Sequence, residues 1–308
     1  MKVAVIGSPG DEQTILSILE ALASAEVDAY GLKIHDNWTA LSRSQLESHL
    51  LKASHYLLVA TELNAGSAWF AFAGGYGLGR ASGTAIFRDD PSRALPRYLA
   101  GTPVLDTLPE LAGYYAAERD EWDLQEARRL ARSALLEMGI SYHADALAQC
   151  VMEGDTKAVE LFLDAGFLPD ARDRHGVTLL CLAARNRHRS IAQLLLDRGA
   201  SVDLASEDRG YTPLMDAALV GSPELLDLFL SAGADVDAVS KDGQTALIVA
   251  VGRNDAETVR KLLAHGADPD IADKLGLSAR KYAALFRKPD IAPQFETLAE
   301  RGRREEKR

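Results

Sequence analysis

The residues of this chain that could do chemistry begin with the loop GSPGD (Gly7 to Asp11), which directly follows the apolar run KVAVI. A glycine-containing loop that opens a helix can hold a phosphate at the helix N-terminus. This loop lacks the Lys-Ser/Thr end of a P-loop and the G-x-G-x-x-G of a dinucleotide-binding fold, and Asp11 and Glu12 would repel a phosphate. Ser8 and Asp11 have the spacing of a capping box, with Pro9 at the first helical position. We therefore favour a structural turn over a phosphate site.

Polar and aromatic side chains that could contact a nucleotide also occur near the expected carboxyl ends of several strands. In open parallel sheets, ligands bind beyond these ends, where the strand order reverses. The candidate nucleotide crevice consists of Ser8, Gly10, His35, Trp38, Glu62, Asn64 and Trp69. Packing in a core explains Trp69 equally well, so only the clustering of the whole set would be informative.

The elements that must position these residues are indicated by the apolar runs KVAVIGS, VDAYGLKI, HYLLVAT, TAIFRDD and TPVLDTL. Helical patterns lie between them, in EQTILSILEALASA, SRSQLESHLLKA, SAWFAFAGGYG and SRALPRYL. Alternating strands and helices predict a parallel sheet that is covered on both faces. We predict an N-terminal α/β domain over residues 1–117, with the flavodoxin-like strand order 2-1-3-4-5.

The layout of this half resembles the Rossmann-like TIR and nucleoside deoxyribosyltransferase domains. The resemblance covers roughly Met1 to Tyr115 and is carried by KVAVIGS, SHYLLVAT, the Ser-Ala-Trp of Ser67 to Trp69, and GYGLGR leading into TAIF. Either family implies a glutamate that handles a ribosyl cation or forms a glycosyl ester. The TIR pattern places it at Ala73 and the deoxyribosyltransferase pattern near Ala71. Alanine can do neither reaction, so we predict a catalytically degenerate TIR-like domain with no catalytic residue.

A substitute carboxylate is the alternative to this emptied site. Glu62, Asp89 and Asp90 all follow predicted strands and could take the role. The rival function is then an N-glycosidase or glycosyltransferase acting on NAD or a nucleoside, with the C-terminal half as a targeting module. A sensor that binds a nucleotide without cleaving it fits both halves of the chain.

The second half of the chain is a repeat. Two sets of glycines recur at steps of 33 or 34 residues: Gly166, Gly199, Gly233 and Gly266, then Gly176, Gly210, Gly243 and Gly276. Such a period indicates stacked repeat units. The segment GYTPLMDAALVGSPELLDLFLSAGADVDA is the clearest copy of a turn followed by two helices. It resembles the ankyrin repeat, and the resemblance covers about Tyr142 to Gly302.

The repeat pattern sets the expected domain organisation. We predict a bridging helix over residues 118–140, an all-α ankyrin solenoid of about five units over 141–302, and a charged tail over 303–308. Hydroxyl side chains two residues after each turn glycine can cap the first helix of a unit; they are Thr178, Thr212, Thr245 and Ser278.

Two departures from the repeat pattern concern polar residues. The family's usual histidine after TPL is replaced by Cys181, Met215, Ile248 and Lys281. Asp216 takes a core-facing position that is Leu182 and Val249 in the neighbouring units. A buried acid needs a partner or a shifted pKa. Asp216 could therefore be a local cap at a solvated edge, or it could make a polar contact with a ligand chain.

The ankyrin resemblance implies a protein partner on the concave face, which the hairpin tips and the ends of the first helices form. The matching residues are Arg174, His175, Arg185, Asn186, Asp208, Arg209, Tyr211, Leu219, Val220, Lys241, Asp242, Gln244 and Arg253. A plain solvated face would explain most of them. Tyr211, Leu219 and Val220 are different, because an apolar cluster at an exposed site needs a reason. We therefore predict that Tyr211, flanked by Arg209 and Arg185, is the centre of the interface.

Composition limits the remaining function classes. A net charge of −11 over 308 residues disfavours nucleic acid and anionic membranes as partners. The two cysteines, Cys150 and Cys181, lie in apolar helical patterns, which predicts buried, reduced thiols. We expect no membrane span, signal peptide, metal or cofactor and a cytoplasmic location. The sequence thus predicts a protein-binding scaffold or adaptor.

Overall fold

A computed structural model describes residues 1–34, 47–61, 67–79, 83–92 and 94–295. The chain divides into two compact units, Met1–Glu126 and Ala127–Arg308, and each is described by itself. In the described residues, no helix combines the length and the apolar character that crossing a membrane would need.

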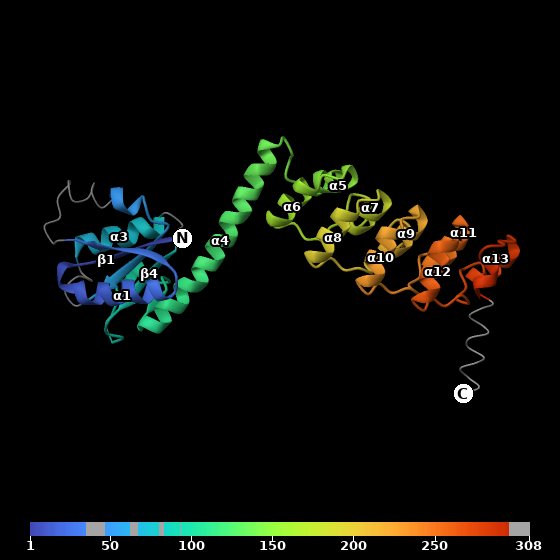
Figure 1. Ribbon diagram of the computed structural model, residues 1–308. Helices are drawn as coiled ribbons and strands as arrows, with labels where there is room; N and C mark the ends of the chain where they lie inside the picture. The colour runs from blue at the N-terminus through green and yellow to red at the C-terminus, as the bar shows by residue number, and fades with distance from the viewer. Residues whose placement is uncertain (35–46, 62–66, 80–82, 93, 296–308) are drawn as a thin grey trace, which may run out of the picture. The chain divides into compact units, whose positions relative to one another are not determined.

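The first unit is built on a parallel five-stranded sheet with the order β2-β1-β3-β4-β5. Its strands are β1 (Lys2–Gly7), β2 (Asp28–Lys33), β3 (His55–Ala60), β4 (Thr84–Arg88) and β5 (Val104–Leu105). The predicted flavodoxin-like order is therefore confirmed. Helix α1 (Glu12–Ser24) and helix α3 (Ala68–Gly79) lie on opposite faces of the sheet (Figure 1).

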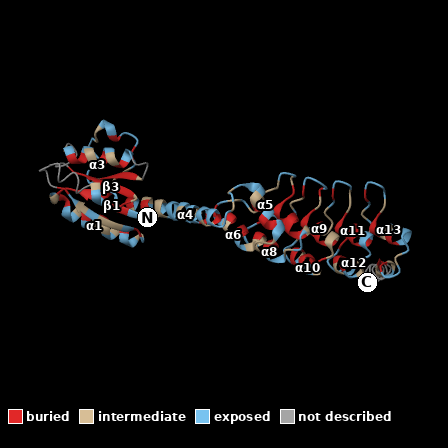
Figure 2. Ribbon diagram, turned by 90° about the horizontal axis from the view of Figure 1, so that it is seen from above, coloured by how far each residue is buried: buried red, intermediate tan, exposed pale blue. Residues whose placement is uncertain are grey.

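Strands β1 and β3 are buried on both faces of the sheet. Successive side chains of a strand point to opposite faces, and each face is covered by a helix. Val3 and Val5 pack with Ile18 of α1 in one core cluster. Ala4 and Ile6 belong to the other cluster, on the side of α3. Figure 2 shows the buried strands between partly exposed helices. This arrangement explains why β1 and β3 read as continuous apolar runs.

Glycines let α3 approach the sheet closely. A Cβ at Gly77 would lie 2.5 Å from the Thr84 hydroxyl oxygen, and one at Gly74 would lie 3.0 Å from Leu99. The α3 backbone nevertheless continues to Gly79. The glycines thus serve close packing without breaking the helix.

Three predicted elements differ in the structure. SRALPRYL forms only a short 3-10 helix, η2 (Arg97–Leu99), because its proline and the preceding residues do not continue a helical ladder. TPVLDTL contains only the two-residue strand β5. The bridging helix, α4 (Leu108–Glu137), begins at Leu108 rather than at residue 118. The Thr107 hydroxyl accepts a hydrogen bond from the Glu110 N–H at 3.3 Å, which caps this earlier start.

The last turns of α4 pack on the first repeat unit. Leu135 is fully buried in the repeat core. Arg132 donates to the Ala165 carbonyl at 3.3 Å, and its guanidinium carbon lies 4.6 Å from the Tyr142 ring centroid. Leu124, near the middle of α4, is exposed.

The second unit consists of helix pairs that stack in sequence order (Figure 1). They are α5 (Ala144–Glu153) with α6 (Thr156–Asp164), α7 (Leu179–Arg185) with α8 (Arg189–Asp197), α9 (Pro213–Val220) with α10 (Pro223–Ser231), and α11 (Ala246–Arg253) with α12 (Ala256–Ala264), followed by α13 (Ala279–Leu285). Every predicted cap accepts a bond from the backbone N–H three residues on; the acceptors are Thr178, Thr212, Thr245 and Ser278. The turn glycines of both sets have positive φ, which glycine adopts without strain.

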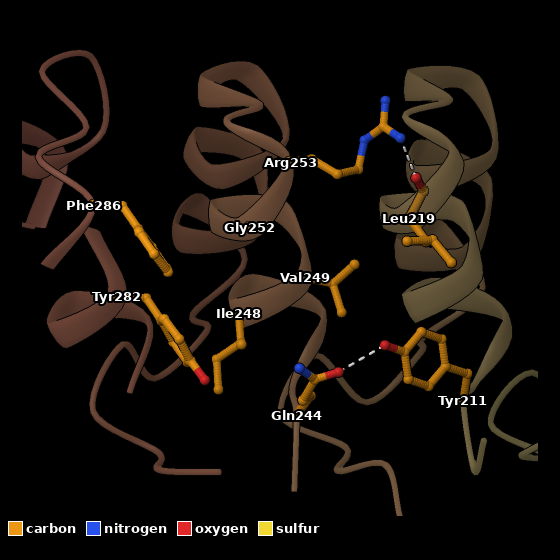
Figure 3. A pocket seen from close by; sticks show the side chains of 9 residues that line it. All are labelled: Tyr211, Leu219, Gln244, Ile248, Val249, Gly252, Arg253, Tyr282 and Phe286. Atoms are coloured by element: carbon orange, nitrogen blue, oxygen red, sulfur yellow. Dashed lines mark hydrogen bonds between the residues drawn. The ribbon is translucent and has the colours of Figure 1, made fainter. Parts of the chain in front are cut away.

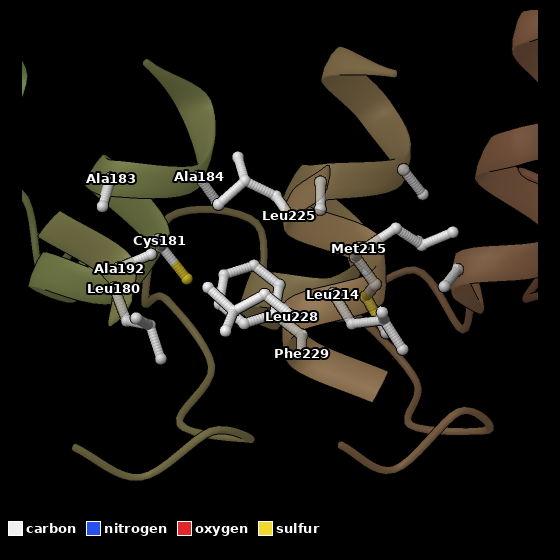
Figure 4. Close-up of a cluster of buried hydrophobic side chains, with 14 of the residues drawn as sticks. Leu180, Cys181, Ala183, Ala184, Ala192, Leu214, Met215, Leu225, Leu228 and Phe229 are labelled. Carbon is white, nitrogen blue, oxygen red and sulfur yellow. The ribbon is translucent and has the colours of Figure 1, made fainter. Parts of the chain in front are cut away.

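Apolar side chains from neighbouring pairs fill one continuous core along the repeats. Figure 4 shows Phe229 and Leu225 of α10 among residues of α7 and α9. Cys181 is fully buried there, as predicted, and burial raises the pKa of its thiol to about 12. Such a thiol is protonated and unreactive at neutral pH.

Aspartates also link successive units. Asp170 accepts a hydrogen bond from the Ser201 N–H at 2.8 Å, Asp203 from the Asp235 N–H at 2.9 Å, and Asp237 from the Asp268 N–H at 2.9 Å. Asp270, next in this series, accepts two bonds from the Arg280 guanidinium, at 2.9 and 3.1 Å.

Candidate functional site

The GSPGD loop closes on itself through its own carboxylate. Asp11 is buried and accepts hydrogen bonds from the Ser8 N–H at 2.7 Å and from the Ser8 hydroxyl at 2.5 Å. The predicted capping box and the proline at the first helical position are both present. A buried carboxylate at this point opposes an incoming phosphate, which supports the interpretation as a structural turn.

The candidate nucleotide crevice is described only in part. Ser8 is buried, Gly10 is exposed, and Trp69 is 1% exposed in the core beneath α3. Trp69 packs edge-on against Phe70 with ring centroids 5.6 Å apart, so packing accounts for its burial. His35, Trp38, Glu62 and Asn64 lie outside the described residues, and the clustering of the set stays a prediction.

The two positions of the missing glutamate differ in environment. Ala73 is buried against the sheet, whereas Ala71 is exposed. Ala73 is 1% exposed, so a glutamate in its place would lie among apolar core side chains. Of the three substitute carboxylates, Asp89 and Asp90 lie one and two residues past β4, and Glu62 lies outside the described residues.

Asp89 lines a hollow of about 270 Å³ beyond the ends of β4 and β5. The other lining residues are Gln13, Thr14, Ser17, Phe87, Asp106 and Leu108. Asp106 accepts bonds from the Arg88 guanidinium at 2.7 and 2.8 Å, and this pairing lowers the pKa of Asp106. The sequence did not predict this ion pair, because Arg88 at the end of β4 and Asp106 just after β5 are 18 residues apart and meet only through the pairing of the two strands.

An ion-pair cluster around the buried Asp216 joins two repeat units. Asp216 is fully buried, and its Oδ2 accepts from the Arg185 Nε at 2.9 Å. The two terminal nitrogens of Arg185 donate to Asp208 at 2.7 and 3.1 Å, and one also donates to the Ser206 hydroxyl at 3.1 Å. Asp216 Oδ1 has no hydrogen-bond partner among the described residues. Asp216 is therefore neither a solvated cap nor an exposed contact, and Arg185 holds a hairpin tip against α9.

A groove runs across α9, α11 and α13. It has a volume of about 260 Å³ and is lined by Tyr211, Leu219, Gln244, Ile248, Val249, Gly252, Arg253, Tyr282 and Phe286. Figure 3 shows Tyr282 and Phe286 on one side, Tyr211 and Leu219 on the other, and Val249 and Gly252 between them. We call this set of residues the Gly252 groove.

Polar contacts fix the edges of the groove. The Tyr211 hydroxyl donates to Gln244 Oε1 at 2.7 Å, and the Arg253 guanidinium donates to the Leu219 carbonyl. Four residues of the predicted interface thus meet here. Ile248, Val249, Gly252, Tyr282 and Phe286 were not predicted to bind, although the repeat register of α11 and α13 could have identified them.

The other predicted interface residues lie outside this groove. Arg174 and His175 are exposed at a hairpin tip, and Lys241 donates to the Glu207 carbonyl across two tips. The Asn186 side chain donates to the Leu182 carbonyl at 2.9 Å at the end of its helix. These residues have structural contacts, and their part in binding stays a prediction.

Comparison with known proteins agrees with the repeat geometry. The family model for ankyrin repeats in three copies matches residues 147–239 and 214–295. The second half of the chain is an ankyrin repeat region. A protein of Treponema pallidum (strain Nichols) described as ankyrin repeat-containing is 43% identical over 178 residues, which are 58% of this chain and 60% of that protein. The mouse B-cell lymphoma 3 protein homolog is 42% identical over 125 residues, 39% of this chain and 28% of that protein. The chain thus spans less than two thirds of the length of these relatives.

No family is named for the N-terminal sheet by these matches, so the TIR-like resemblance stays a prediction.

The ankyrin register also shows which positions of the repeat line the groove. Leu182, Asp216, Val249 and Tyr282 are equivalent residues of successive first helices, and the last two line the groove. Asp216, the acid that the sequence marked as unusual, therefore lies in the repeat next to Val249, at the equivalent position.

Asp216 should make the stability of the ankyrin region depend on pH. Burial raises its pKa to about 6, although Arg185 acts in the opposite direction. The unfolded chain has the ordinary value of about 3.9, so the folded state binds more protons between about pH 4 and 6. Stability from this group is therefore lost as pH rises through that window. One pKa unit corresponds to about 1.4 kcal/mol, and the two pKa values differ by about two units. The free energy of unfolding should therefore fall by about 3 kcal/mol across this window, whereas Asp216→Asn should not show this fall.

Urea unfolding of both proteins at a series of pH values measures this difference. Asp208 does not interfere, since its hydrogen bonds to Arg185 lower its pKa and its titration falls below the window. The histidines are common to both proteins and cancel in the comparison. If the free energies of unfolding of the two proteins changed with pH in parallel, Asp216 would not bind a proton in the folded state within this window, and the prediction would be wrong.

Proposed function

We propose that the ankyrin repeats bind a protein partner through the face that carries the Gly252 groove, with Tyr211 at its centre. The observation that supports this most is an apolar hollow, bordered by Leu219, Tyr282 and Phe286, on a chain of high net charge. Phe286 is 55% exposed. Exposed apolar patches with a polar rim are typical of interaction sites.

The structure modifies the proposed centre in one respect. Arg185 uses its guanidinium on Asp208 and Asp216 within the protein, so we assign it the role of positioning the hairpin tip. Arg209 has no such pairing in the described part of the chain, and its guanidinium carbon lies 6.0 Å from the Tyr211 ring centroid. We therefore propose Tyr211 and Arg209 as the pair that faces the partner.

Truncation of Tyr211 tests the proposal. Anchors of this type contribute about 2 kcal/mol or more, so Tyr211→Ala should weaken partner binding about thirtyfold. The partner is first captured on the immobilised full chain from extracts of the source cells, and the affinity of the purified pair is then measured by calorimetry. Tyr211→Phe, which loses only the bond to Gln244, is the matched control and should weaken binding far less. Undiminished binding by a correctly folded Tyr211→Ala protein would move the interface elsewhere.

For the N-terminal domain we propose a catalytically silent TIR-like module that offers a second binding surface. The alanines at positions 71 and 73 support this proposal. The purified protein should consume neither NAD nor a nucleoside over background, as measured by chromatography of the reaction mixture. Turnover that disappears in Glu62→Gln would instead assign catalysis to Glu62 and revive the alternative of an N-glycosidase or nucleotide sensor.

A further inference from the structure

The Gly252 groove is hollow because one helix lacks a side chain that its neighbours carry. The equivalent positions in adjacent repeats are Arg185, Leu219 and Leu285. The backbone does not require glycine at this point, because Gly252 has no left-handed φ. A Cβ built on Gly252 would meet nothing within 4 Å. Glycine inside a helix is less stable than alanine, so leaving this position without a side chain lowers the stability of α11.

The size and walls of the groove suit side chains of another protein. Its volume of about 260 Å³ is below the roughly 300–1,000 Å³ of pockets that enclose small molecules. Tyr282 and Phe286 stack with ring centroids 5.8 Å apart and an interplanar angle of 10°, which gives one wall a flat aromatic surface. Leu219 and Val249 complete an apolar interior. A large aliphatic or aromatic side chain fits this surface best.

Positive charge at the groove is not neutralised within the protein. Arg253 lines the groove and donates to the Leu219 carbonyl. Over the described residues, neither Arg253 nor Arg209 has a carboxylate within salt-bridge distance. A carbonyl uses only part of the donor capacity of a guanidinium, so Arg253 can still bind a carboxylate.

The carboxylates near the groove are mostly engaged. Asp216 is bound by Arg185 at 2.9 Å, and Asp273 accepts from the Tyr282 hydroxyl at 2.6 Å. Asp242 and Arg209 act on the pKa of Tyr211 in opposite directions. Of the nine residues that line the groove, Arg253 alone is charged, on a chain whose net charge is −11.

We propose that the groove receives a bulky apolar side chain from a protein partner, and that an acidic residue beside this side chain pairs with Arg253. This inference rests on the proposed protein-binding function and specifies the partner segment. Gly252 is then the residue that determines specificity, since a bulky side chain such as leucine at this position would occupy the space of the partner's anchor.

Random peptides displayed on phage and selected on the immobilised full chain provide the probe. We expect the enriched peptides to combine leucine or an aromatic residue with aspartate or glutamate. Fluorescein-labelled copies are then titrated by anisotropy against four variants. Gly252→Leu should lower affinity about thirtyfold, as expected for loss of an anchor. Gly252→Ala adds a single methyl group. The loss of affinity that it causes should be at least ten times smaller than the loss caused by Gly252→Leu, so about threefold or less. Leucine already occupies the equivalent positions 219 and 285, so Gly252→Leu should fold.

Charge reversal tests the acidic residue separately. Arg253→Glu should lower the affinity for the same peptides about tenfold or more. Added salt should reduce the difference in affinity between the wild type and this variant. Arg260→Glu, at an exposed position on α12, makes the same change in net charge away from the groove and should leave affinity unchanged.

The outcomes separate this inference from the proposed function. Enriched peptides that bind Gly252→Leu as tightly as the wild type would overturn the groove and leave partner binding by the ankyrin face intact. Enrichment of basic peptides, or indifference to Arg253→Glu, would overturn the acidic residue. Selection that enriches no peptide overturns the inference as well, whereas the proposed function fails only if Tyr211→Ala retains full affinity for the captured partner.

Discussion

Arg185→Leu should lower the free energy of unfolding of the ankyrin region by about 3–5 kcal/mol at pH 7, because it leaves the fully buried carboxylate of Asp216 without its partner. Asp208 and the Ser206 hydroxyl lose the same guanidinium. Urea unfolding followed by far-UV circular dichroism measures the change. The loss should shrink at pH 5, since an unpaired buried carboxylate avoids its charge by binding a proton.

A double variant provides the control for this prediction. Arg185→Leu combined with Asp216→Leu places leucine where neighbouring repeats have Leu219 and Leu182. Replacing a buried ion pair by packed apolar residues is often neutral or stabilising, so the double variant should recover most of the loss. The coupling energy follows from the double-mutant cycle. Single and double variants of equal stability would show that the cluster contributes nothing through the pairing.

Trp69→Ala should destabilise the N-terminal unit by about 3–5 kcal/mol, the usual range when a large aromatic side chain is removed from a core. Trp69 is 1% exposed and packs between α3 and the sheet with Phe70 and Leu58. In thermal unfolding, the transition of the N-terminal unit should move to lower temperature, whereas the transition of the ankyrin region should stay in place.

Trp69→Phe distinguishes packing from ligand contact. It fills most of the space and should cost clearly less stability than the alanine variant. A Trp69→Ala protein that keeps its stability but no longer binds NAD, where the wild type does, would place Trp69 in a nucleotide site instead of the core.

The repeat half could be predicted closely because its signals are local. Turn glycines with positive φ and hydroxyl caps act within a few residues, and their fixed period sets the register of the whole array. The parallel sheet of the N-terminal unit was also predicted correctly, from the alternation of apolar runs with helical patterns. Its strand order agrees with the flavodoxin-like order that we chose, although the alternation alone does not determine an order. The start of α4 was not, since the cap at Thr107 lies inside a segment that reads as a strand.

The candidate site was less predictable because it depends on contacts between repeats. The sequence identified Asp216 as an unusual acid, but its partner Arg185 lies in the preceding unit, and that contact follows only from the stacking. Arg185 was consequently expected at the interface. The Gly252 groove depends on an absent side chain, which residue types alone do not reveal until the positions on either side of it are known in space.

The aspartates that join successive repeats give the array a direction, because each carboxylate accepts a hydrogen bond from the unit that follows it in the chain. Asp170, Asp203 and Asp237 each bind the backbone of the following unit. At Asp270 the acceptor is occupied by Arg280 of α13. An internal unit could accordingly be duplicated with every such junction preserved, whereas a copy inserted directly before α13 would have to displace Arg280 from Asp270 if it were to continue the series of bonds.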